Sequence, residues 1–555
     1  MTPGTDRDTA DGMNLARIRH IIDQIRHERF RFKPARRTYL PKKNGGKRPL
    51  GIPTFNDKLV QEALRQILEA YYEPRFRDSS HGFRTGYGCH TALTRIKRQF
   101  RGTVWFIEGD IRGCFDNINH DILMAILARD IRDGRLLNLI RMSLEAGVLD
   151  NWQYHRTYSG TPQGGVLSPL LANIYLNELD SFVEDILIPQ YTRGKRKATN
   201  PEYQALSNSI QKARKSGDID LVHELERERR QLPSLDVNDL SYRRLYYVRY
   251  ADDFLLGFTG TKAEAKDIKN ALGQFLHETL GLEMSNEKPL ITHARSGYAH
   301  FLGYAVSVYH SNHMRSYDRR VGGMKRSVNG QIRLGVPFGL VDQHCKRYMK
   351  HGKPIHEPAL EFCSAADIIL RYQQRYRGLV EYYKYATDRG QFNKLRYIME
   401  TALTKTLAHK FKISVKAVYR RFRGKRDVGG YTYNTLEVEV QTDNGSHIIW
   451  WGAVPLKVIK PEAEPVTDQK HVEWAVYSDV IQRLKANTCE LCGSHGNCEV
   501  HHVRKLSDLK KRWAGRRSKP FWVKRMIAMH RKPLIVCQQC HINLHAGRPT
   551  PSKRK

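Results

Sequence analysis

Residues 245–258 read LYYVRYADDFLLGF, and this stretch decides the predicted fold of the chain. Two apolar, β-favouring runs flank a tight turn that carries Asp252 and Asp253, which is the pattern of a β-hairpin. Adjacent carboxylates repel each other unless a cation lies between them, so the turn indicates a divalent-metal site. For the dipeptide alone, a solvated turn would be the more frequent meaning.

A partner for this turn stands earlier in the chain. A metal pair that neutralises charge on a phosphate needs a further carboxylate. Asp110 ends the strand-like run that begins at Val104, and it is the best candidate. Together with the β pattern around the turn, Asp110 favours the metal site over the solvated turn.

The composition limits the classes of function. The 555 residues are enough for about three or four domains. The net charge is +36 and Lys and Arg recur along the whole length, which favours nucleic acid as the partner. A membrane is the weaker alternative, because no apolar run approaches the roughly 20 residues of a spanning helix and no signal peptide is visible. Five of the nine cysteines lie between residues 489 and 540, which indicates a reducing compartment and a local metal site.

Several segments around the acidic turn carry recognisable patterns. Residues 40–53 form a basic Gly/Lys hairpin that could lay Lys42 and Arg48 against a triphosphate, although a solvated hairpin is the commoner meaning of such a run. A glycine-rich turn at residues 160–169 precedes an apolar helix, and Asn119 is expected to cap another helix. Residues 190–244 are charged and poor in core-forming side chains, which predicts a helical insertion outside the main core.

From about residue 365 the chain becomes helical, basic and aromatic. Two apolar helical stripes are expected to form a core. The opposite faces carry basic residues that are free to meet phosphates, among them Arg371, Arg375, Arg377 and Lys384. Residues 425–485 contain a strand-like run at 436–440, but the sequence leaves their fold open.

The carboxyl-terminal region has the spacing of a metal module. Cys489 and Cys492 form one thiolate pair and Cys537 and Cys540 a second, enough for a tetrahedral zinc. His541 and His545 are four residues apart and share one face of a helix, and His501 and His502 stand between the cysteine pairs. These patterns predict a structural zinc and a separate catalytic metal site. A plain zinc ribbon that only binds DNA is the alternative.

The order of these motifs resembles a known family. Asp110-x4-Phe115, Pro162-Gln163-Gly164, Tyr250-Ala251-Asp252-Asp253, Lys288 and Leu302-Gly303 resemble the sequence blocks of a reverse transcriptase. The charged insertion, the basic helices and the Cys/His module narrow the match to a group II intron-encoded protein. The resemblance covers nearly the whole chain and is weakest at residues 425–485.

The resemblance implies an α/β right-hand polymerase with a small zinc-stabilised ββα-type HNH nuclease. Fingers and palm would occupy residues 1–310, and a helical thumb or maturase domain (domain X), which binds RNA, residues 311–424. A DNA-binding or linker region would follow at 425–485 and the HNH endonuclease at 486–555. Thr2-Pro3-Gly4-x-Asp6 resembles the middle of a family block, so an upstream helical segment is expected to be missing.

The resemblance also assigns roles in the polymerase. Asp110, Asp252 and Asp253 would hold two magnesium ions that align the primer hydroxyl with the incoming triphosphate. Phe115 would lie under the sugar and exclude a 2′-hydroxyl. The other substrate-binding residues implied are Lys42, Arg48, Gln163, Gly164 and Lys288.

In the nuclease, the resemblance implies that His502 acts as general base. His501, His541 and His545 would position the nuclease metal, again expected to be magnesium, and the four cysteines would hold zinc. One departure from the family pattern is Lys532, which stands where the central Asn of the H-N-H motif is expected.

The implied function is an RNA-directed DNA polymerase that also promotes splicing of its own intron RNA and nicks target DNA for intron mobility by target-primed reverse transcription. The alternative is a splicing maturase in which RNA binding matters most. Intact metal-binding carboxylates argue against a decayed polymerase. The expected partners are group II intron RNA, double-stranded target DNA, dNTPs and a second copy of the chain, without a membrane. The expected location is a bacterial cytoplasm or nucleoid, or the matrix of a chloroplast or mitochondrion.

Overall fold

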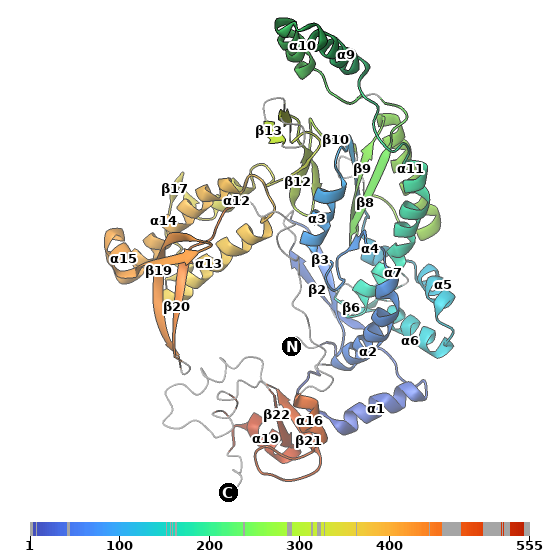
Figure 1. Ribbon diagram of the computed structural model, residues 1–555. Helices are drawn as coiled ribbons and strands as arrows, with labels where there is room; N and C mark the ends of the chain where they lie inside the picture. Colours follow the sequence, from blue (N-terminus) through green and yellow to red (C-terminus); the bar gives the residue numbers. More distant parts are fainter. Residues whose placement is uncertain are drawn as a thin grey trace.

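The architecture is that of a computed structural model. It describes residues 4–6, 8–41, 45–150, 153–155, 157, 159–160, 164–236, 239–285, 291–311, 315–318, 323–326, 328–361, 363–442, 445–457, 479–502, 523, 526 and 533–548. Figure 1 shows a central body, a helical hairpin that projects from it, a helical region to one side and a small module next to the beginning of the chain. No helix in these ranges is long and apolar enough to cross a membrane.

The predicted hairpin at residues 245–258 forms the middle of a five-stranded sheet with the strand order β10-β5-β9-β8-β4. The hairpin forms as predicted, but Tyr250 pairs with Asp253, so the turn comprises Ala251 and Asp252 and Asp253 is the first residue of β9. Strand β4 is parallel to β8, and the other neighbouring strands are antiparallel. The strands are β4 (Ser80–His81), β5 (Trp105–Asp110), β8 (Arg244–Tyr250), β9 (Asp253–Thr259) and β10 (Ile291–His293).

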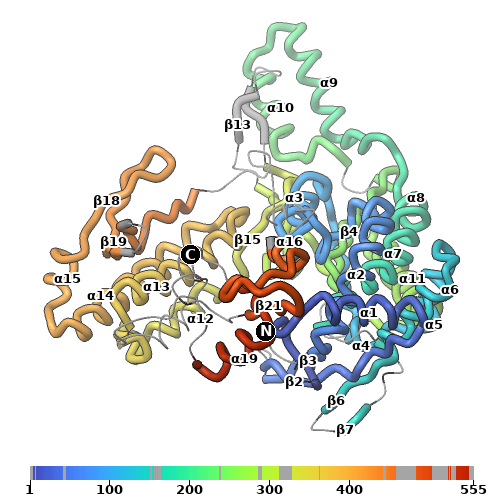
Figure 2. Tube along the Cα trace, turned by 90° about the horizontal axis from the view of Figure 1, so that it is seen from below, coloured from blue at the N-terminus to red at the C-terminus, as the bar shows by residue number. Residues whose placement is uncertain are grey.

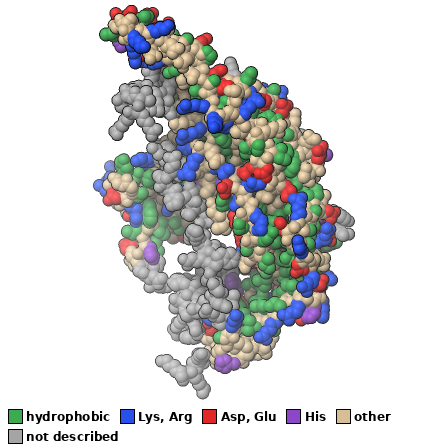
Figure 3. All heavy atoms as spheres, turned by 45° about the vertical axis from the view of Figure 1, so that its right-hand side comes forward, with side chains coloured by type: hydrophobic (Ala, Val, Ile, Leu, Met, Phe, Trp, Pro, Cys, Tyr) green, Lys and Arg blue, Asp and Glu red, His purple; other side chains and the backbone are tan. Residues whose placement is uncertain are grey.

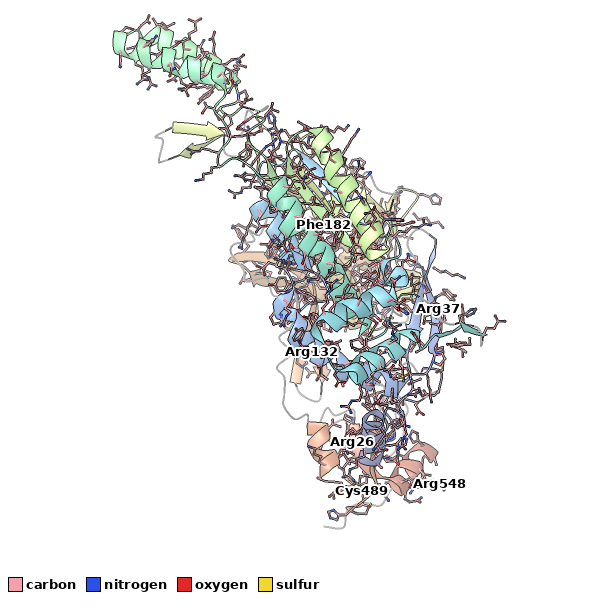
Figure 4. The ribbon with its side chains drawn as sticks, turned by 90° about the vertical axis from the view of Figure 1, so that its right-hand side faces the viewer. Arg26, Arg37, Arg132, Phe182, Cys489 and Arg548 are labelled. Carbon is pink, nitrogen blue, oxygen red and sulfur yellow. The ribbon has the colours of Figure 1, made fainter. Side chains whose placement is uncertain are left out.

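This sheet separates two hydrophobic cores. Successive side chains of a strand point to opposite faces. Phe106 and Leu255 therefore pack into a core with α3 and the thumb, whereas Ile107 and Leu256 pack into a core with α7 and α11. Phe182, which follows α7, stacks on Phe275 of α11 with ring centroids 4.2 Å apart (Figure 4). The helices of the body are α2 (Phe55–Tyr72), α3 (Cys89–Gln99), α4 (Cys114–Asn117), α5 (His120–Asp130), α6 (Gly134–Glu145), α7 (Ser168–Ser181), the π-helical η2 (Phe182–Leu187), α8 (Ile188–Gln190) and α11 (Lys262–Leu280).

Local capping signals set where these helices begin. The Asn119 side chain accepts hydrogen bonds from the backbone N–H groups of Asp121 and Ile122, which confirms it as the cap of α5. Thr261 and Glu264 form a reciprocal capping box at the start of α11.

The basic hairpin predicted at residues 40–53 belongs to a second sheet with the strand order β3-β2-β6-β7. Leu40 faces Arg48 across this hairpin. The strands are β2 (Ala35–Pro41), β3 (Lys47–Ile52), β6 (Val148–Asp150) and β7 (Gln153–His155).

The charged insertion is a pair of helices that projects from the body (Figure 1). Helices α9 (Pro201–Ser216) and α10 (Ile219–Gln231) pack against each other, and Arg214 forms an ion pair with Glu226 at 2.7 Å. The segments that lead into and out of the insertion lie side by side and are joined by an antiparallel backbone bridge between Arg193 and Arg243. The five-stranded sheet is the palm sheet. Residues that follow it form two further small sheets, one of β11 (Ala299–Phe301), β12 (Tyr304–Val308) and β15 (Ile332–Gly335), and one of β13 (Arg315–Asp318) and β14 (Gly323–Arg326).

The thumb combines helices with a sheet that covers them. Its elements are α12 (Leu340–Lys346), β16 (Met349–Lys350), β17 (Lys353–Pro354), α13 (Ala365–Tyr382), α14 (Phe392–Phe411), α15 (Val415–Phe422), β18 (Arg423–Val428), β19 (Tyr431–Thr442) and β20 (Gly445–Gly452). Gln373 of α13 exchanges two hydrogen bonds with the backbone of Gly452, and Trp451 lies buried beside Tyr376. The first part of residues 425–485 is thus a sheet whose inner face continues the core of the thumb.

Among the described residues, the carboxyl-terminal module contains α16 (Asp479–Lys485), β21 (Cys498–His502), β22 (Pro533–Cys537) and α19 (Gln538–Ala546), which confirms the predicted ββα fold. Its sheet has a third strand from the other end of the chain. Strand β1 (Met13–Asn14) pairs with β21, and Met13 is buried in the core of the module. Helix α1 (Leu15–Arg26) follows directly, so Figures 1 and 2 both show the beginning of the chain beside β21.

Candidate active sites

The palm sheet brings the predicted acids together. Asp110 ends β5, Asp253 begins β9, and the two face each other as partners in the antiparallel register. The backbone N–H of Ile111 donates to the carbonyl of Asp252 at 3.4 Å, which places the turn beside the end of β5. All three acidic residues are half-buried. Asp110 therefore lies at the same edge of the sheet as the Asp252-Asp253 turn.

A buried ion pair contacts the backbone of this turn and holds it in place. Arg249 and Asp180 have completely buried side chains, and Nε of Arg249 donates to Oδ1 of Asp180 at 2.8 Å. Nη1 of Arg249 donates to the carbonyl of Ala251 at 2.9 Å, and Ala251 holds a positive φ of 54°. Nη2 donates to the Ser80 hydroxyl at 2.6 Å. Burial alone would lower the pKa of the guanidinium, but the Asp180 carboxylate more than offsets this and raises the pKa.

The sequence alone does not identify the ion pair between Arg249 and Asp180. The available signal is a charged residue inside each of two apolar segments, Arg249 in a strand and Asp180 in a helix. Charged side chains in such positions are almost never fully buried unless they are paired. The pairing itself joins residues 69 positions apart, which no local pattern specifies.

The acidic site has a buried thiol as a neighbour. Cys114 lies buried next to it, and burial together with the charges of Asp252 and Asp110 raises the pKa of its thiol to about 12. The thiol therefore stays neutral and adds no charge. Three carboxylates with oxygen donors suit magnesium. In the described part of the chain, the residues whose ligand atoms lie within 4.8 Å of one another form two clusters, and neither contains these three acids.

The predicted nucleotide pocket is partly described. Phe115 on α4 is half-buried and meets Phe83 edge to face, with ring centroids 5.9 Å apart. Gly164 has a φ of 107°, and a Cβ atom there would lie 2.7 Å from the carbonyl oxygen of Gly51 on β3. The glycine thus lets the turn approach the basic hairpin, on which Arg48 is exposed. Lys42, Gln163 and Lys288 lie outside the described residues.

The four predicted cysteines form one cluster. Their sulfur atoms all lie within 4.8 Å of one another, and Sγ of Cys492 is 3.7 Å from Sγ of Cys537. Four thiolates at about 2.3 Å from a tetrahedral zinc would be separated by about 3.7–3.8 Å, so the cluster fits zinc. Burial opposes ionisation of Cys492, but hydrogen bonds from Ser494 and the neighbouring cysteines lower the pKa of its thiol to about 6.

A second cluster contains the three predicted histidines and one further residue that the sequence does not single out. His501, His541, His545 and Asp11 each place a ligand atom within 4.8 Å of the others. Burial lowers the pKa of His501 to about 4, so its imidazole is neutral and able to bind a cation. Nδ1–H of His541 donates to the Glu499 carboxylate at 2.7 Å, which turns Nε2 towards the cluster. Asp11 carries no sequence signal that separates it from other acids near the amino end, because its partners are about 490 to 530 residues away.

His502 lies next to this cluster on β21 and is half-buried. Its backbone N–H donates to Oδ1 of Asp11 at 2.7 Å. Lys532, where the H-N-H pattern expects Asn, lies outside the described residues. In the described part of the chain, His501, His541 and His545 thus share one cluster, His502 contacts it through its backbone, and the cysteines form a separate cluster (Figure 4 labels Cys489).

The basic residues predicted to bind RNA differ in their surroundings. Arg371 and Arg377 are exposed on α13. Arg375 instead forms an ion pair with Glu357 at 2.8 Å, and Lys384 is half-buried with its ammonium 5.1 Å from the ring centre of Tyr385. Figure 3 shows Lys and Arg side chains spread over one face of the body and over the projecting helices. The positive charge is thus distributed, as the composition predicts.

Three family models match successive parts of the chain. They are reverse transcriptase (RNA-dependent DNA polymerase) over residues 40–195, type II intron maturase over 340–478, and AI2M/AI1M-like HNH endonuclease over 489–541. The maturase match spans both the thumb helices and the sheet β18–β20. The chain therefore carries a reverse transcriptase, a maturase and an HNH endonuclease domain.

Similar proteins match the chain over different shares of their own length. The group II intron-encoded protein LtrA of Lactococcus lactis subsp. cremoris is 39% identical over 561 residues, which cover 97% of this chain and 90% of LtrA. An uncharacterized 91 kDa protein in the cob intron of Schizosaccharomyces pombe is 34% identical over 584 residues, 100% of this chain and 68% of that protein. The mitochondrial nuclear intron maturase 2 of Arabidopsis thaliana is 26% identical over 425 residues, 67% of this chain and 55% of that protein.

Among solved structures, telomerase from Candida albicans has a TM-score of 0.34 and 13% identity, covering 72% of this chain and 63% of that chain. The family follows from LtrA and from the order of the three domains. The chain belongs to the group II intron-encoded proteins, with reverse transcriptase, maturase and HNH endonuclease domains in one polypeptide.

Proposed function

We propose that Asp110, Asp252 and Asp253 are the metal-binding residues of RNA-directed DNA synthesis. The observation that carries this proposal is the pairing of Asp110 with Asp253 across β5 and β9, at the edge where the turn places Asp252. Magnesium, when bound there, would supply positive charge to the primer hydroxyl and the phosphates. The chain's own contribution is position, since Arg249 holds the turn through the carbonyl of Ala251.

The incoming deoxynucleotide is proposed to lie between the palm and the basic hairpin. Phe115 would pack under the sugar and leave no room for a 2′-hydroxyl. Gly164 and Gln163 would line the base and sugar, and Lys42, Arg48 and Lys288 would meet the phosphates. The close approach of Gly164 to Gly51 supports this arrangement, because it brings the pocket turn to the hairpin that carries Arg48.

In the nuclease, His502 is proposed to act as general base for cleavage of one strand of double-stranded DNA. A neutral imidazole suits this role near neutral pH. His501, His541 and His545 would hold a divalent cation, proposed to be magnesium, which would stabilise charge on the phosphate. Zinc at Cys489, Cys492, Cys537 and Cys540 would hold the fold of the module together.

The thumb is proposed to bind the intron RNA that encodes the protein and to promote its splicing. Exposed Arg371 and Arg377 on α13 support this role, with Arg375 and Lys384 as flanking contacts. Target DNA, dNTPs and a second copy of the chain complete the proposed partners. A bacterial cytoplasm or an organelle matrix is the proposed location, in keeping with relatives from a bacterium and from mitochondria.

The central experiment is primer extension on an RNA template with purified protein, with and without the surrounding intron RNA. Asp252→Asn should abolish synthesis, because it removes a ligand charge while leaving the side-chain shape. Asp267→Asn is the matched control, because Asp267 is exposed on α11 and should leave synthesis unchanged. Undiminished extension by Asp252→Asn would overturn the assignment.

A further inference from the structure

The nuclease cluster contains an acidic ligand from the opposite end of the chain. Asp11 Oδ1 lies 3.2 Å from Nε2 of His541, and Asp11 Oδ2 lies 2.7 Å from Nε2 of His545. The two Nε2 atoms are 3.1 Å apart, and Nδ1 of His501 is 3.6 Å from Oδ1 of Asp11. All four residues thus direct donor atoms into one small volume.

These separations match those of ligands around a single cation. Ligands at about 2.0–2.1 Å from a cation lie about 2.8–3.0 Å apart at neighbouring octahedral positions and about 3.3–3.4 Å apart around a tetrahedral ion. Two of the proposed ligands also make a hydrogen bond to a neighbouring residue that orients them, as is usual for metal sites. Glu499 accepts from Nδ1–H of His541, and the N–H of His502 donates to the Asp11 carboxylate.

The position of Asp11 is set by the backbone that follows it. The N–H of Gly12 donates to the carbonyl of Val500 at 2.9 Å, and Met13 then pairs with Val500. Met13 is 8% exposed and packs in the core of the nuclease. The segment is therefore an edge strand of the nuclease sheet, and Asp11 lies at the place where that strand begins beside β21.

The segment also connects the nuclease to the polymerase. Helix α1 starts immediately after β1 and leads to β2 of the basic hairpin sheet. In Figure 1, α1 begins beside the module and runs away from it, and Ile21 of this helix is buried in a core of the body. A ligand at Asp11 would therefore join the two ends of the chain through a cation.

We infer that Asp11 is the fourth protein ligand of the nuclease cation, supplied by the amino-terminal strand of the polymerase. This inference rests on the proposed nuclease site and adds to it a residue from outside residues 486–555. Its consequence is that the nuclease metal site is complete only when the amino-terminal segment is docked on β21. Cation binding should in turn tighten that docking, since the two equilibria are linked.

The test is a titration of the full-length protein with Co²⁺, followed by visible absorption. The cysteine cluster is kept loaded with zinc, and the Asp252→Asn background removes the polymerase site. Asp11→Ala should weaken Co²⁺ binding by at least about tenfold, since loss of even an outer-shell partner typically costs that much, and it should change the absorption bands. Asp8→Ala is the matched control, because Asp8 lies in the same segment but pairs with Arg17 on the surface.

Two further variants separate the explanations. Asp11→His should recover much of the affinity, because it offers a nitrogen ligand at the same place; failure to recover would mean that Asp11 acts only by docking the segment. His545→Ala should weaken Co²⁺ binding in any case. If His545→Ala and the unsubstituted background bind Co²⁺ alike, the nuclease metal site itself is wrong. If Asp11→Ala binds Co²⁺ as tightly as the unsubstituted background while His545→Ala binds it more weakly, the cation does bind at the nuclease site but Asp11 is not one of its ligands.

Hydrogen exchange supplies a readout that does not depend on catalysis. Co²⁺ should slow exchange of the amides in residues 8–14, including the Gly12 N–H that bonds to Val500. Asp11→Ala should abolish this metal-dependent slowing while Asp8→Ala retains it. Equal slowing in both variants would contradict the link between cation and docking.

Discussion

At the scale of single residues, the polymerase turn depends on a charge pair that never touches substrate. Arg249 and Asp180 are both removed from water, and each would carry a large desolvation cost without the other. Their hydrogen bonds reach Ser80 and the carbonyl of Ala251, so the pair connects α7, β4 and the turn. The position of Asp252 therefore follows from buried contacts beneath it.

Asp180→Asn should lower the free energy of unfolding by about 3–5 kcal/mol, the usual cost of leaving a buried charge unpaired. Urea unfolding measured by circular dichroism would check this. Glu178→Gln is a matched control two residues away on the same helix, because its partner Arg129 is largely exposed. It should cost at most about 1 kcal/mol. Equal losses for the two variants would contradict the role given to the buried pair.

At the scale of elements, two modules depend on contacts that extend beyond their predicted borders. The thumb helices share a core with β18–β20 through Trp451, which has 1% of its surface exposed. The nuclease sheet includes β1 from the start of the chain. In both cases an edge or a face that would otherwise meet water is covered by a distant segment.

Cys537→Ser should remove zinc from the nuclease and unfold it locally, because structural zinc contributes folding free energy directly. DNA nicking should be lost while RNA-templated synthesis continues. Bound zinc, measured by metal analysis, and both activities provide the check. Cys498→Ala is the matched control, because burial raises the pKa of the Cys498 thiol to about 11 and it lies outside the ligand cluster. Zinc retained in Cys537→Ser would refute the ligand assignment.

Charge reversal at Arg371 and Arg377 should weaken binding of intron RNA and make the affinity depend less steeply on salt. For single strands, removing one phosphate contact reduces the slope of log affinity against log salt by about 0.7. Binding measured from low to moderate salt would show this. Lys266→Glu, at an exposed position of α11, serves as the control for the change in net charge of a single reversal. Arg375 is unsuitable, since reversing it also breaks the ion pair with Glu357. An unchanged slope would place the RNA surface elsewhere.

At the scale of the whole molecule, the polymerase and nuclease sites are built on different sheets with different cores. The acidic turn belongs to the five-stranded palm sheet, and the histidine cluster belongs to the sheet of β1, β21 and β22. The two parts meet through the amino-terminal segment and α1 (Figure 2). Chemistry at one site therefore involves no side chain of the other.

His502→Ala should stop DNA nicking and leave RNA-templated synthesis unchanged, while Asp252→Asn should do the reverse. The reason is that alanine keeps the backbone N–H of residue 502, which donates to Asp11, so the metal cluster and the docked segment stay in place. Both activities should be assayed side by side on both variants. Loss of synthesis in His502→Ala would mean that the two sites are coupled.

Much of the chain was predictable because its signals are local. The two apolar runs on either side of Asp252 specify a hairpin, and the cap at Asn119 specifies where α5 begins. The Cys-x-x-Cys pairs and the four-residue spacing of His541 and His545 place ligands on one turn or one helix face, whatever the rest of the fold. Charge spread over the sequence indicates nucleic acid for the same reason, since it requires no knowledge of contacts.

Only the tertiary structure could identify contacts between distant segments. Asp11 becomes part of the nuclease cluster because β1 docks on β21, although Asp11 and His502 are 491 residues apart in the sequence. Arg249 finds Asp180 because a strand packs on a helix, and Trp451 lies beside α13 because a sheet covers that helix. Periodicity and spacing determine which face of an element is apolar or carries ligands. Which partner covers that face depends on packing of the whole chain, and so does the complete set of residues in each site.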